Sequence, residues 1–438
     1  MPLRVLSYFG LAFCWAFFAC SKSPSPAAPT NPTNPVTPTN PTTPAGVTMN
    51  LDLTPYQPTA ATFTFELIIA EPGGQVLLDT VTTTNSPIIA KIQSADSLVN
   101  VTTIIRDSTG YLSAFGYRGV NPSTWKYSAP APDVRIPYPA AAYTAADAYF
   151  ENVPPPPPTP PNYAGDIALF DYNTTSTISG YYDSTSTAIY ARYANAYAYL
   201  LLPYAGLYKL YKPANDNEIV SLATMDTAVT VQLNLPAQFM MEQGGAAFQT
   251  QLTGITDTTD LTQSVQLGPT AYGTGPDTYN TYFQIPKTPM QKYETQVSGY
   301  NVGNLVYYYN YGSTVPATPV FPDPGSFTVV SNQGDSFAIT FTGQHPTYYK
   351  TDWANTGNIS LSLWSSPDSN AVNPMTFLNG LKSKLLSGAS FSGLKCYDLQ
   401  LETIAGFNYG SFLNYVSNPT LKTTQRVSTA SMLEQSYH

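Results

Sequence analysis

The chain has 438 residues, enough for two or three domains, and only 10% of them are charged, against about 25% in an average protein. Lys and Arg number 18 and Asp and Glu number 27, which gives a formal net charge of −9 and disfavours nucleic-acid binding through a basic patch. The abundance of tyrosine (34) and proline (40) is typical of an exported, β-rich protein.

The first 19 residues have the organisation of an export signal. Arg4 is the only charge before an apolar run over residues 5–18, which is shorter than the about 20 residues that span a bilayer. The run leads into Phe-Phe-Ala-Cys at positions 17–20, which resembles the lipobox of bacterial lipoproteins. The resemblance implies an acylated Cys20, and with it a lipid anchor at the outer membrane, on the cell surface rather than on the periplasmic face. The alternative is an ordinary signal peptide cut nearby.

A proline-rich stalk follows the signal, over residues 20–46. From Pro26 to Pro44 every third residue is proline, and a polyproline II helix has about three residues per turn. In that conformation the stalk could hold the following residues roughly 70 Å from the lipid. As a disordered linker it would still be a spacer without a core.

Residues 47–132 have the pattern of a small β domain. Apolar and polar residues alternate over 62–69, which predicts a half-buried strand. Further apolar runs cover 76–78, 88–92, 98–105 and 111–117, with turn sequences between them. Short strands at this spacing predict a β-sandwich that resembles an immunoglobulin-like module without its disulfide.

Residues 133–162 lose this alternation and contain an Ala/Tyr stretch and a polyproline run, which predicts a linker. The strand pattern returns over 163–438, as one large antiparallel domain or as two that are divided near 313–325. Within it we predict a strand over 229–235 and a hairpin that joins 327–329 to 337–341. One helix is predicted near 374–387, with Asn373 as its cap. The predicted fold class is therefore mainly β.

Motifs for catalysis or metal binding are scarce. The histidines are His345 and His438, and neither accompanies a zinc or serine-hydrolase motif. Cys14 is lost with the signal and Cys20 would be acylated, so Cys396 has no disulfide partner. We therefore predict no catalytic residue, metal or cofactor. A hydrolase could still use two carboxylates that the sequence cannot pair, from the candidates Asp171, Asp183, Glu242, Asp352 and Glu402.

Aromatic residues form the most unusual part of the composition. In a strand, Tyr193, Tyr197 and Tyr199 would project from one face, and Trp353 and Trp364 belong to another aromatic group. Exposed aromatic rings suit sugar rings or extended peptides, so these five residues are the predicted ligand-binding residues. The alternative is that tyrosine fills the edges of charge-poor sheets.

These features predict a lipid-anchored protein of the cell envelope that is not an enzyme. It would bind a glycan, a peptide or a partner protein through tyrosine-rich sheet surfaces. Two alternatives remain open: an exported hydrolase such as a glycosidase, and a structural scaffold of an envelope complex.

Overall fold

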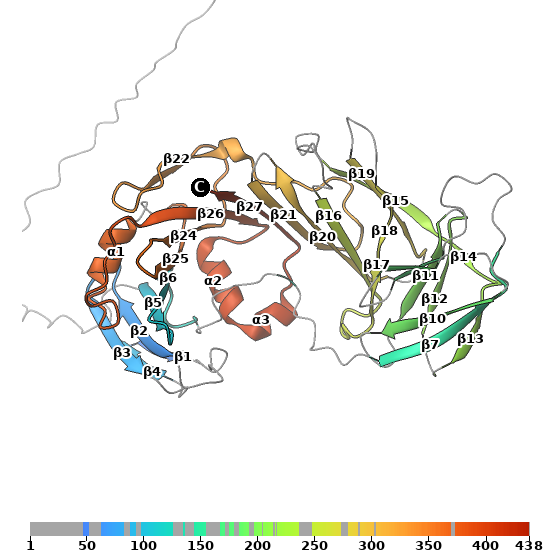
Figure 1. Cartoon of the computed structure of the whole chain (residues 1–438), viewed down its shortest axis with the longest axis horizontal. Coiled ribbons are helices and arrows are strands. Elements are labelled where there is room, and N and C mark those ends of the chain that lie inside the picture. Colours follow the sequence, from blue (N-terminus) through green and yellow to red (C-terminus); the bar gives the residue numbers. More distant parts are fainter. Residues whose placement is uncertain are drawn as a thin grey trace, which may run out of the picture. The chain divides into compact units, whose positions relative to one another are not determined.

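The computed structural model describes the chain in segments (Figure 1). Features that the sequence predicts outside these segments stay predictions. Cys20, the stalk, Tyr193, the polyproline run from residue 155, and the carboxylates Asp171, Asp183 and Glu242 all lie outside the described residues. The described residues are 47–51, 63–82, 88–92, 98–125, 135, 144–154, 167–170, 175–178, 184–191, 197–203, 205–212, 215, 217–235, 248–272, 279–287, 290–301, 304–368 and 373–437.

The largest sheet in the described part of the chain has twelve strands, and the prediction of a mainly β fold is confirmed. Its neighbouring strands are antiparallel except for β25 and β6, which run parallel. In spatial order the strands are β17 (Ser264–Leu267), β16 (Phe248–Ile255), β20 (Lys292–Asn301), β21 (Asn304–Gly312), β27 (Thr429–Ser436), β26 (Lys395–Ile404), β24 (Tyr348–Ala354), β25 (Ile359–Ser365), β6 (Leu112–Val120), β5 (Val99–Arg106), β2 (Thr64–Ala70) and β3 (Val76–Thr82).

This sheet joins parts of the sequence that lie on both sides of the boundary predicted near residue 132. The strands predicted at 62–69, 98–105 and 111–117 do form, but β6 pairs with β25 from the C-terminal part. By their internal contacts, residues Pro44–His438 make up one compact unit. A parallel pair needs a long connection, and this one spans more than two hundred residues, which sequence patterns do not reveal.

The remaining strands form five smaller sheets. One of these strands, β7, lies in the stretch predicted as a linker, where its alanines hide the strand pattern. The predicted strand over 229–235 and the predicted hairpin after residue 327 are both confirmed. The sheets are β1 (Val47–Leu51) with β4 (Ile88–Ile92); β10 (Ser184–Ala191), β7 (Thr144–Glu151) and β13 (Glu218–Ser221); β14 (Asp226–Thr227), β12 (Leu207–Tyr211), β11 (Ala198–Leu202), β8 (Ile167–Phe170) and β9 (Thr175–Ile178); β15 (Val229–Leu235), β19 (Tyr279–Ile285) and β18 (Pro269–Tyr272); and β22 (Phe327–Ser331) with β23 (Ala338–Phe341).

Strand β2 is buried on both faces, and the prediction of a half-buried strand is wrong here. Ile68 belongs to one apolar cluster, and Leu67 and Ile69 belong to a second cluster on the opposite face. Glu66, which shares the face of Ile68, is fully buried. Its carboxylate accepts hydrogen bonds from the hydroxyl of Ser383 and from the backbone N–H groups of Lys384 and Leu385. These bonds satisfy the buried charge and tie β2 to the segment after α1.

Helix α1 (Pro374–Gly380) begins where predicted, because the Asn373 side chain accepts a hydrogen bond from the N–H of Thr376 at 2.8 Å. It ends before the predicted residue 387. Lys382 has a φ of +51°, which breaks the helix, and the next residues donate to Glu66 instead of continuing the turn. A 3₁₀ helix, η3 (Pro324–Ser326), lies before β22.

Two further helices, α2 (Tyr409–Ser417) and α3 (Pro419–Thr424), were not predicted. Both follow asparagine caps, at Asn408 and Asn418. The ring of Phe412 in α2 stacks on Tyr348 of β24, with 4.3 Å between ring centroids. Figure 1 shows α2 beside the sheet, where it covers part of one face. Among the described helices, none has the length and apolar character needed to cross a membrane.

Candidate binding site

The structure places three of the five predicted ligand-binding residues in the interior. Tyr199, Trp353 and Trp364 are 0%, 0% and 2% exposed, so the exposed aromatic surface predicted at these positions is not formed. The Tyr199 hydroxyl donates to the carbonyl oxygen of Gln284 at 2.6 Å. Tyr197 is half-buried. The pattern misled because alternation shows which residues share a face of a strand, and not whether that face meets water.

The tryptophans pack on other aromatic rings. Trp364 stacks on Tyr117 with 4.7 Å between ring centroids, and Trp353 meets the ring of Phe337 edge-on at 4.9 Å. Contacts of this kind stabilise the fold beyond what the burial of the rings' apolar area contributes. These aromatic residues therefore stabilise the sheet and are not available to a ligand.

Three adjoining hollows lie along one rim of the large sheet, and we call them together the rim groove. At this rim β6, β25 and β26 end, while β5, β24 and β27 begin. The hollows have volumes of about 500, 300 and 540 Å³, in the usual range for small-molecule sites. The first and second share Ser366, Asp368, Asn408 and Tyr409, and the second and third share Gln344, Pro346, Thr403 and Ala405.

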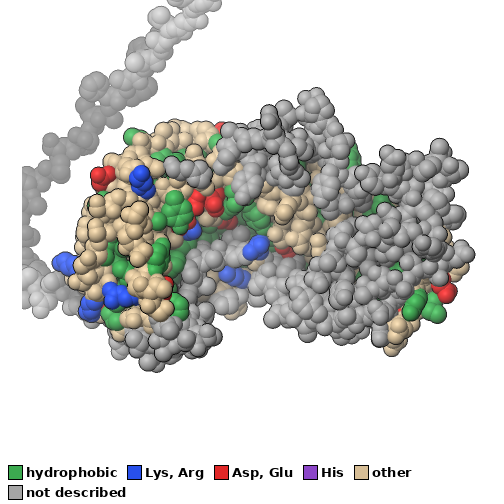
Figure 2. Space-filling model, viewed as in Figure 1, with side chains coloured by type: hydrophobic (Ala, Val, Ile, Leu, Met, Phe, Trp, Pro, Cys, Tyr) green, Lys and Arg blue, Asp and Glu red, His purple; other side chains and the backbone are tan. Residues whose placement is uncertain are grey.

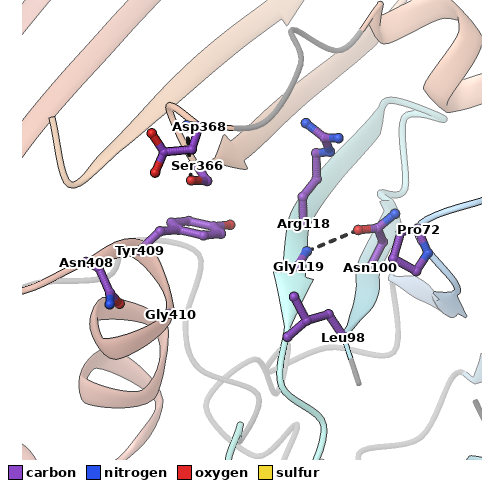
Figure 3. Close-up of a pocket in the computed structure, with 10 residues that line it drawn as sticks. All are labelled: Pro72, Leu98, Asn100, Arg118, Gly119, Ser366, Asp368, Asn408, Tyr409 and Gly410. Atoms are coloured by element: carbon purple, nitrogen blue, oxygen red, sulfur yellow. Dashed lines mark hydrogen bonds between the residues drawn. The ribbon is translucent and has the colours of Figure 1, made fainter. Parts of the chain in front are cut away.

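The first hollow has opposite charges on its two walls (Figure 3). Arg118 of β6 and Asn100 of β5 line one wall, and Asp368 and Tyr409 line the other. Asn100 is held in place because its Oδ1 accepts from the N–H of Gly119 at 3.1 Å. Leu98 lies at the base of the first wall and is 42% exposed. The hollow thus combines an apolar surface with few polar groups of fixed position.

Burial lowers the pKa of Arg118, and the nearby hydroxyls of Tyr349 and Tyr409 act in the opposite direction. A guanidinium stays protonated at any physiological pH, so Arg118 is a cation that has lost part of its hydration. The pKa of Tyr409 is raised by its burial. Its neutral hydroxyl donates to the carbonyl oxygen of Trp364 at 3.0 Å, which fixes the ring as a wall of the hollow.

The start of α2 is built by a capping box. Asn408 Oδ1 accepts from the N–H of Ser411, and Ser411 Oγ accepts from the N–H of Asn408, both at 2.9 Å. Asn408, Tyr409 and Gly410 all line the first hollow. The partial positive charge of the first helical turn therefore lies on the same hollow as Arg118.

The second hollow contains His345, whose Nδ1 lies 2.9 Å from Asp368 Oδ1. Their side chains are 45% and 79% exposed, so the pair is solvated and contributes little to stability. A hydrolytic triad consists of an aspartate, a histidine and a nucleophile that is hydrogen-bonded to the second ring nitrogen of the histidine. The pair supplies the first two of these three members. The pair links the segment before β24 to the segment after β25.

The third hollow lies between the start of β27 and the residues on either side of the hairpin β22–β23. Val320, at its border, is 72% exposed. Asp323 also lines it, and its carboxylate caps η3 by accepting from the N–H of Gly325 at 2.8 Å. The other polar lining groups are mostly neutral hydroxyls and amides, from Ser326, Thr342, Gln344, Thr403, Thr429 and Ser431.

Of the carboxylates singled out in the sequence, the two that the structure describes, Asp352 and Glu402, do not line the rim groove. Asp352 accepts from Lys350 Nζ at 2.7 Å and from Ser362 Oγ at 2.5 Å, and Glu402 accepts from the hydroxyl of Tyr348. Asp352 also lies opposite Asp398 in the register of β24 and β26. Figure 2 shows acidic side chains gathered where Figure 1 labels β26 and β27.

Within the described ranges, no three His, Cys, Asp or Glu side chains are grouped in a way that could hold a metal ion. Cys396 is fully buried, and this burial, with the negative charges of Asp352 and Asp398, raises the pKa of its thiol to about 12. A thiol with that pKa is protonated at neutral pH and is therefore unreactive.

No protein-family model matches the sequence, and neither does any curated protein. A solved structure of a candidate adhesin from Bacteroides ovatus is similar over 58% of this chain and 74% of its own length, with 7% sequence identity and a TM-score of 0.12. A TM-score this low identifies neither a shared fold nor a shared function.

The residues of the rim groove were not found from the sequence because they come from distant segments, near 98–119, 344–347, 366–368 and 403–410. One local signal was present. Asn408 followed by Ser411 is the spacing of a capping box, and it marks the start of α2. No pattern in the sequence places Arg118 across from Asp368.

Proposed function

We propose that this chain is a lipid-anchored protein of the bacterial cell envelope that binds a carbohydrate in the rim groove. The observation that carries this proposal is the first hollow, where Arg118 and Asn100 face Asp368 and Tyr409 across a space of about 500 Å³. The proposal moves the binding site from the tyrosine-rich strands to the rim.

A carbohydrate fits the chemistry of this hollow. Sugars carry neutral hydroxyls that both donate and accept hydrogen bonds, and their rings have apolar faces. Asn100 and Arg118 offer hydrogen-bond donors and Asp368 offers acceptors, and Leu98 offers apolar surface.

The anchor rests on Cys20 and the stalk. Two or more acyl chains on Cys20 would give a stable attachment, and the stalk would hold the sheet away from the lipid. Replacing Cys20 with Ala should release the protein from the membrane fraction and remove the lipid mass from the first peptide. Unchanged membrane retention would contradict lipidation.

Binding is tested with the full mature chain in detergent micelles on an array of neutral and acidic oligosaccharides. Leu98→Trp places an indole in the first hollow and should abolish retention. Val330→Trp is the matched control, because Val330 is 72% exposed on β22 and does not line a hollow of the rim groove. Equal retention by both variants would contradict the assignment of the site, and no retention of any oligosaccharide by the unmodified protein would contradict carbohydrate binding.

A second candidate function is hydrolysis of a glycan by carboxylates. It is favoured by the register of β26 and β27, which pairs Glu434 with Gln400, two residues along from Asp398. There burial, with the charges of Asp398 and Asp352, raises the pKa of Glu434, and Lys350 only partly opposes this. A general acid of a glycosidase needs a raised pKa. Incubation of the same oligosaccharides with the protein should then release new reducing ends, and Glu434→Gln should stop the release. Intact oligosaccharides after prolonged incubation would rule this candidate out.

A further inference from the structure

We infer that the rim groove holds an extended, largely neutral oligosaccharide across three consecutive subsites, instead of a single sugar in one pocket. This inference rests on the proposed carbohydrate binding. It adds the form of the ligand, its charge and the end of the groove where an acidic sugar is accepted.

The three hollows adjoin one another, since neighbouring hollows share lining residues. Asp368 and Tyr409 belong to both the first and the second hollow, and Pro346 and Thr403 belong to both the second and the third. Their order follows the order of the strands, from β5 and β6 through β25 and β24 to β26 and β27. A ligand that fills all three must therefore be linear and lie across the strand ends.

The charges along the groove select against a polyanion. Arg118 provides positive charge in the first hollow, whereas Asp368 lies between the first and second and Asp323 lines the third. A uronic acid is attracted at the Arg118 end and repelled elsewhere. Neutral sugar units suit the second and third hollows, where hydroxyl and amide groups such as Thr403 and Ser431 predominate.

The geometry of the rim favours a sugar chain over an extended peptide. Extended peptides usually bind by pairing with the open edge of a sheet, where backbone groups run along the peptide. The strands of this sheet meet the rim end-on, and their neighbours β24, β25, β26 and β27 already satisfy one another's backbone groups. The rim therefore presents loops and side chains to the ligand in place of a strand edge.

The test measures affinity by titration calorimetry on the full chain in detergent, with ladders of two to eight units. One ladder consists of neutral glucose, mannose and xylose oligosaccharides, and the other of oligogalacturonates. For at least one neutral ladder, affinity should rise at least about tenfold from two units to six, which corresponds to about 1.4 kcal/mol. The oligogalacturonates should show no such rise.

Two variants test which hollow forms which subsite. Val320→Trp fills the third hollow and should remove the gain in affinity from two units to six, and Leu98→Trp, which fills the first hollow, should weaken long oligosaccharides as well. Val330→Trp is the control for both, because Val330 lines none of the three hollows, and it matches Val320 in exposure at 72%. A melting temperature within the range of the unmodified protein shows that each variant is folded.

The outcomes distinguish a failure of the three subsites from a failure of the proposed carbohydrate binding on which they rest. Binding that reaches its full strength with a disaccharide, or that Val320→Trp does not change for long oligosaccharides, overturns the three subsites and leaves carbohydrate binding intact. A rising affinity along the oligogalacturonate ladder overturns the charge selection. Binding of an extended peptide without any oligosaccharide contradicts both proposals.

Discussion

The rim of the large sheet and its interior use side chains in opposite ways. The interior holds the rings that the sequence offers as binding residues, with Tyr199, Trp353 and Trp364 almost wholly removed from water. The rim holds an arginine, an exposed aspartate and neutral polar groups around open hollows. In a chain with so few charges, aromatic residues supply stability, and a small number of polar residues at strand ends line the proposed binding surface.

The largest expected effect comes from the interior. Trp364→Ala should lower the free energy of unfolding by about 3–5 kcal/mol, because it leaves a cavity beside Tyr117 and removes the ring under Lys350. Tyr397→Ala, at a site that is 42% exposed, should change it by less than about 1 kcal/mol. Urea denaturation measures both. A loss of oligosaccharide binding by Trp364→Ala without a loss of stability would instead return the binding site to the aromatic residues.

A smaller effect is expected where β2 meets the segment after α1. Glu66→Gln should cost about 2–3 kcal/mol, because an uncharged amide replaces the carboxylate that accepts three hydrogen bonds at a fully buried site. Ser383→Ala, which removes one of the three donors, should cost less. Both variants should still bind oligosaccharides once folded, since neither residue lines the rim groove. Equal costs for the two would show that the carboxylate charge is not what holds this junction together.

The smallest effect concerns Glu434. Because burial and the neighbouring carboxylates raise its pKa, the folded protein binds its proton more tightly than the unfolded chain does. The resulting stability is present below the ordinary glutamate pKa of 4.5 and is lost as pH rises through the folded pKa. Glu434→Gln should therefore raise the melting temperature slightly near neutral pH, and the difference should vanish below pH 4.5. A lower melting temperature at neutral pH would mean that Lys350 stabilises the ionised form more than burial opposes it.

Local features of the fold could be predicted, because turns, helix caps and the alternation of apolar and polar residues in a strand depend on residues that are neighbours in the sequence. The hairpin from Phe327 and the Asn373 cap are two of them. The pairing of β6 with β25 could not, since no local pattern encodes a partner so far along the chain. The end of α1 depended on Glu66, which lies more than three hundred residues earlier.

The candidate site was missed for the same reason, and the aromatic prediction failed on burial. Arg118 and Asp368 line the same hollow only because two strands end at one rim. Tyr199 was correctly recognised as part of a strand, but both faces of its strand, β11, are covered. Sequence alternation describes a strand and its faces, whereas a site depends on which strand ends lie together.

The most direct test of the rim groove is hydrogen exchange of the full chain, measured with and without the oligosaccharide that the array retains best. Saturating oligosaccharide should slow exchange at residues 344–347, 366–368 and 403–410, and leave 197–212 unchanged. Protection confined to 197–212, with none at the rim, would contradict the account and return the site to the tyrosine-rich strands.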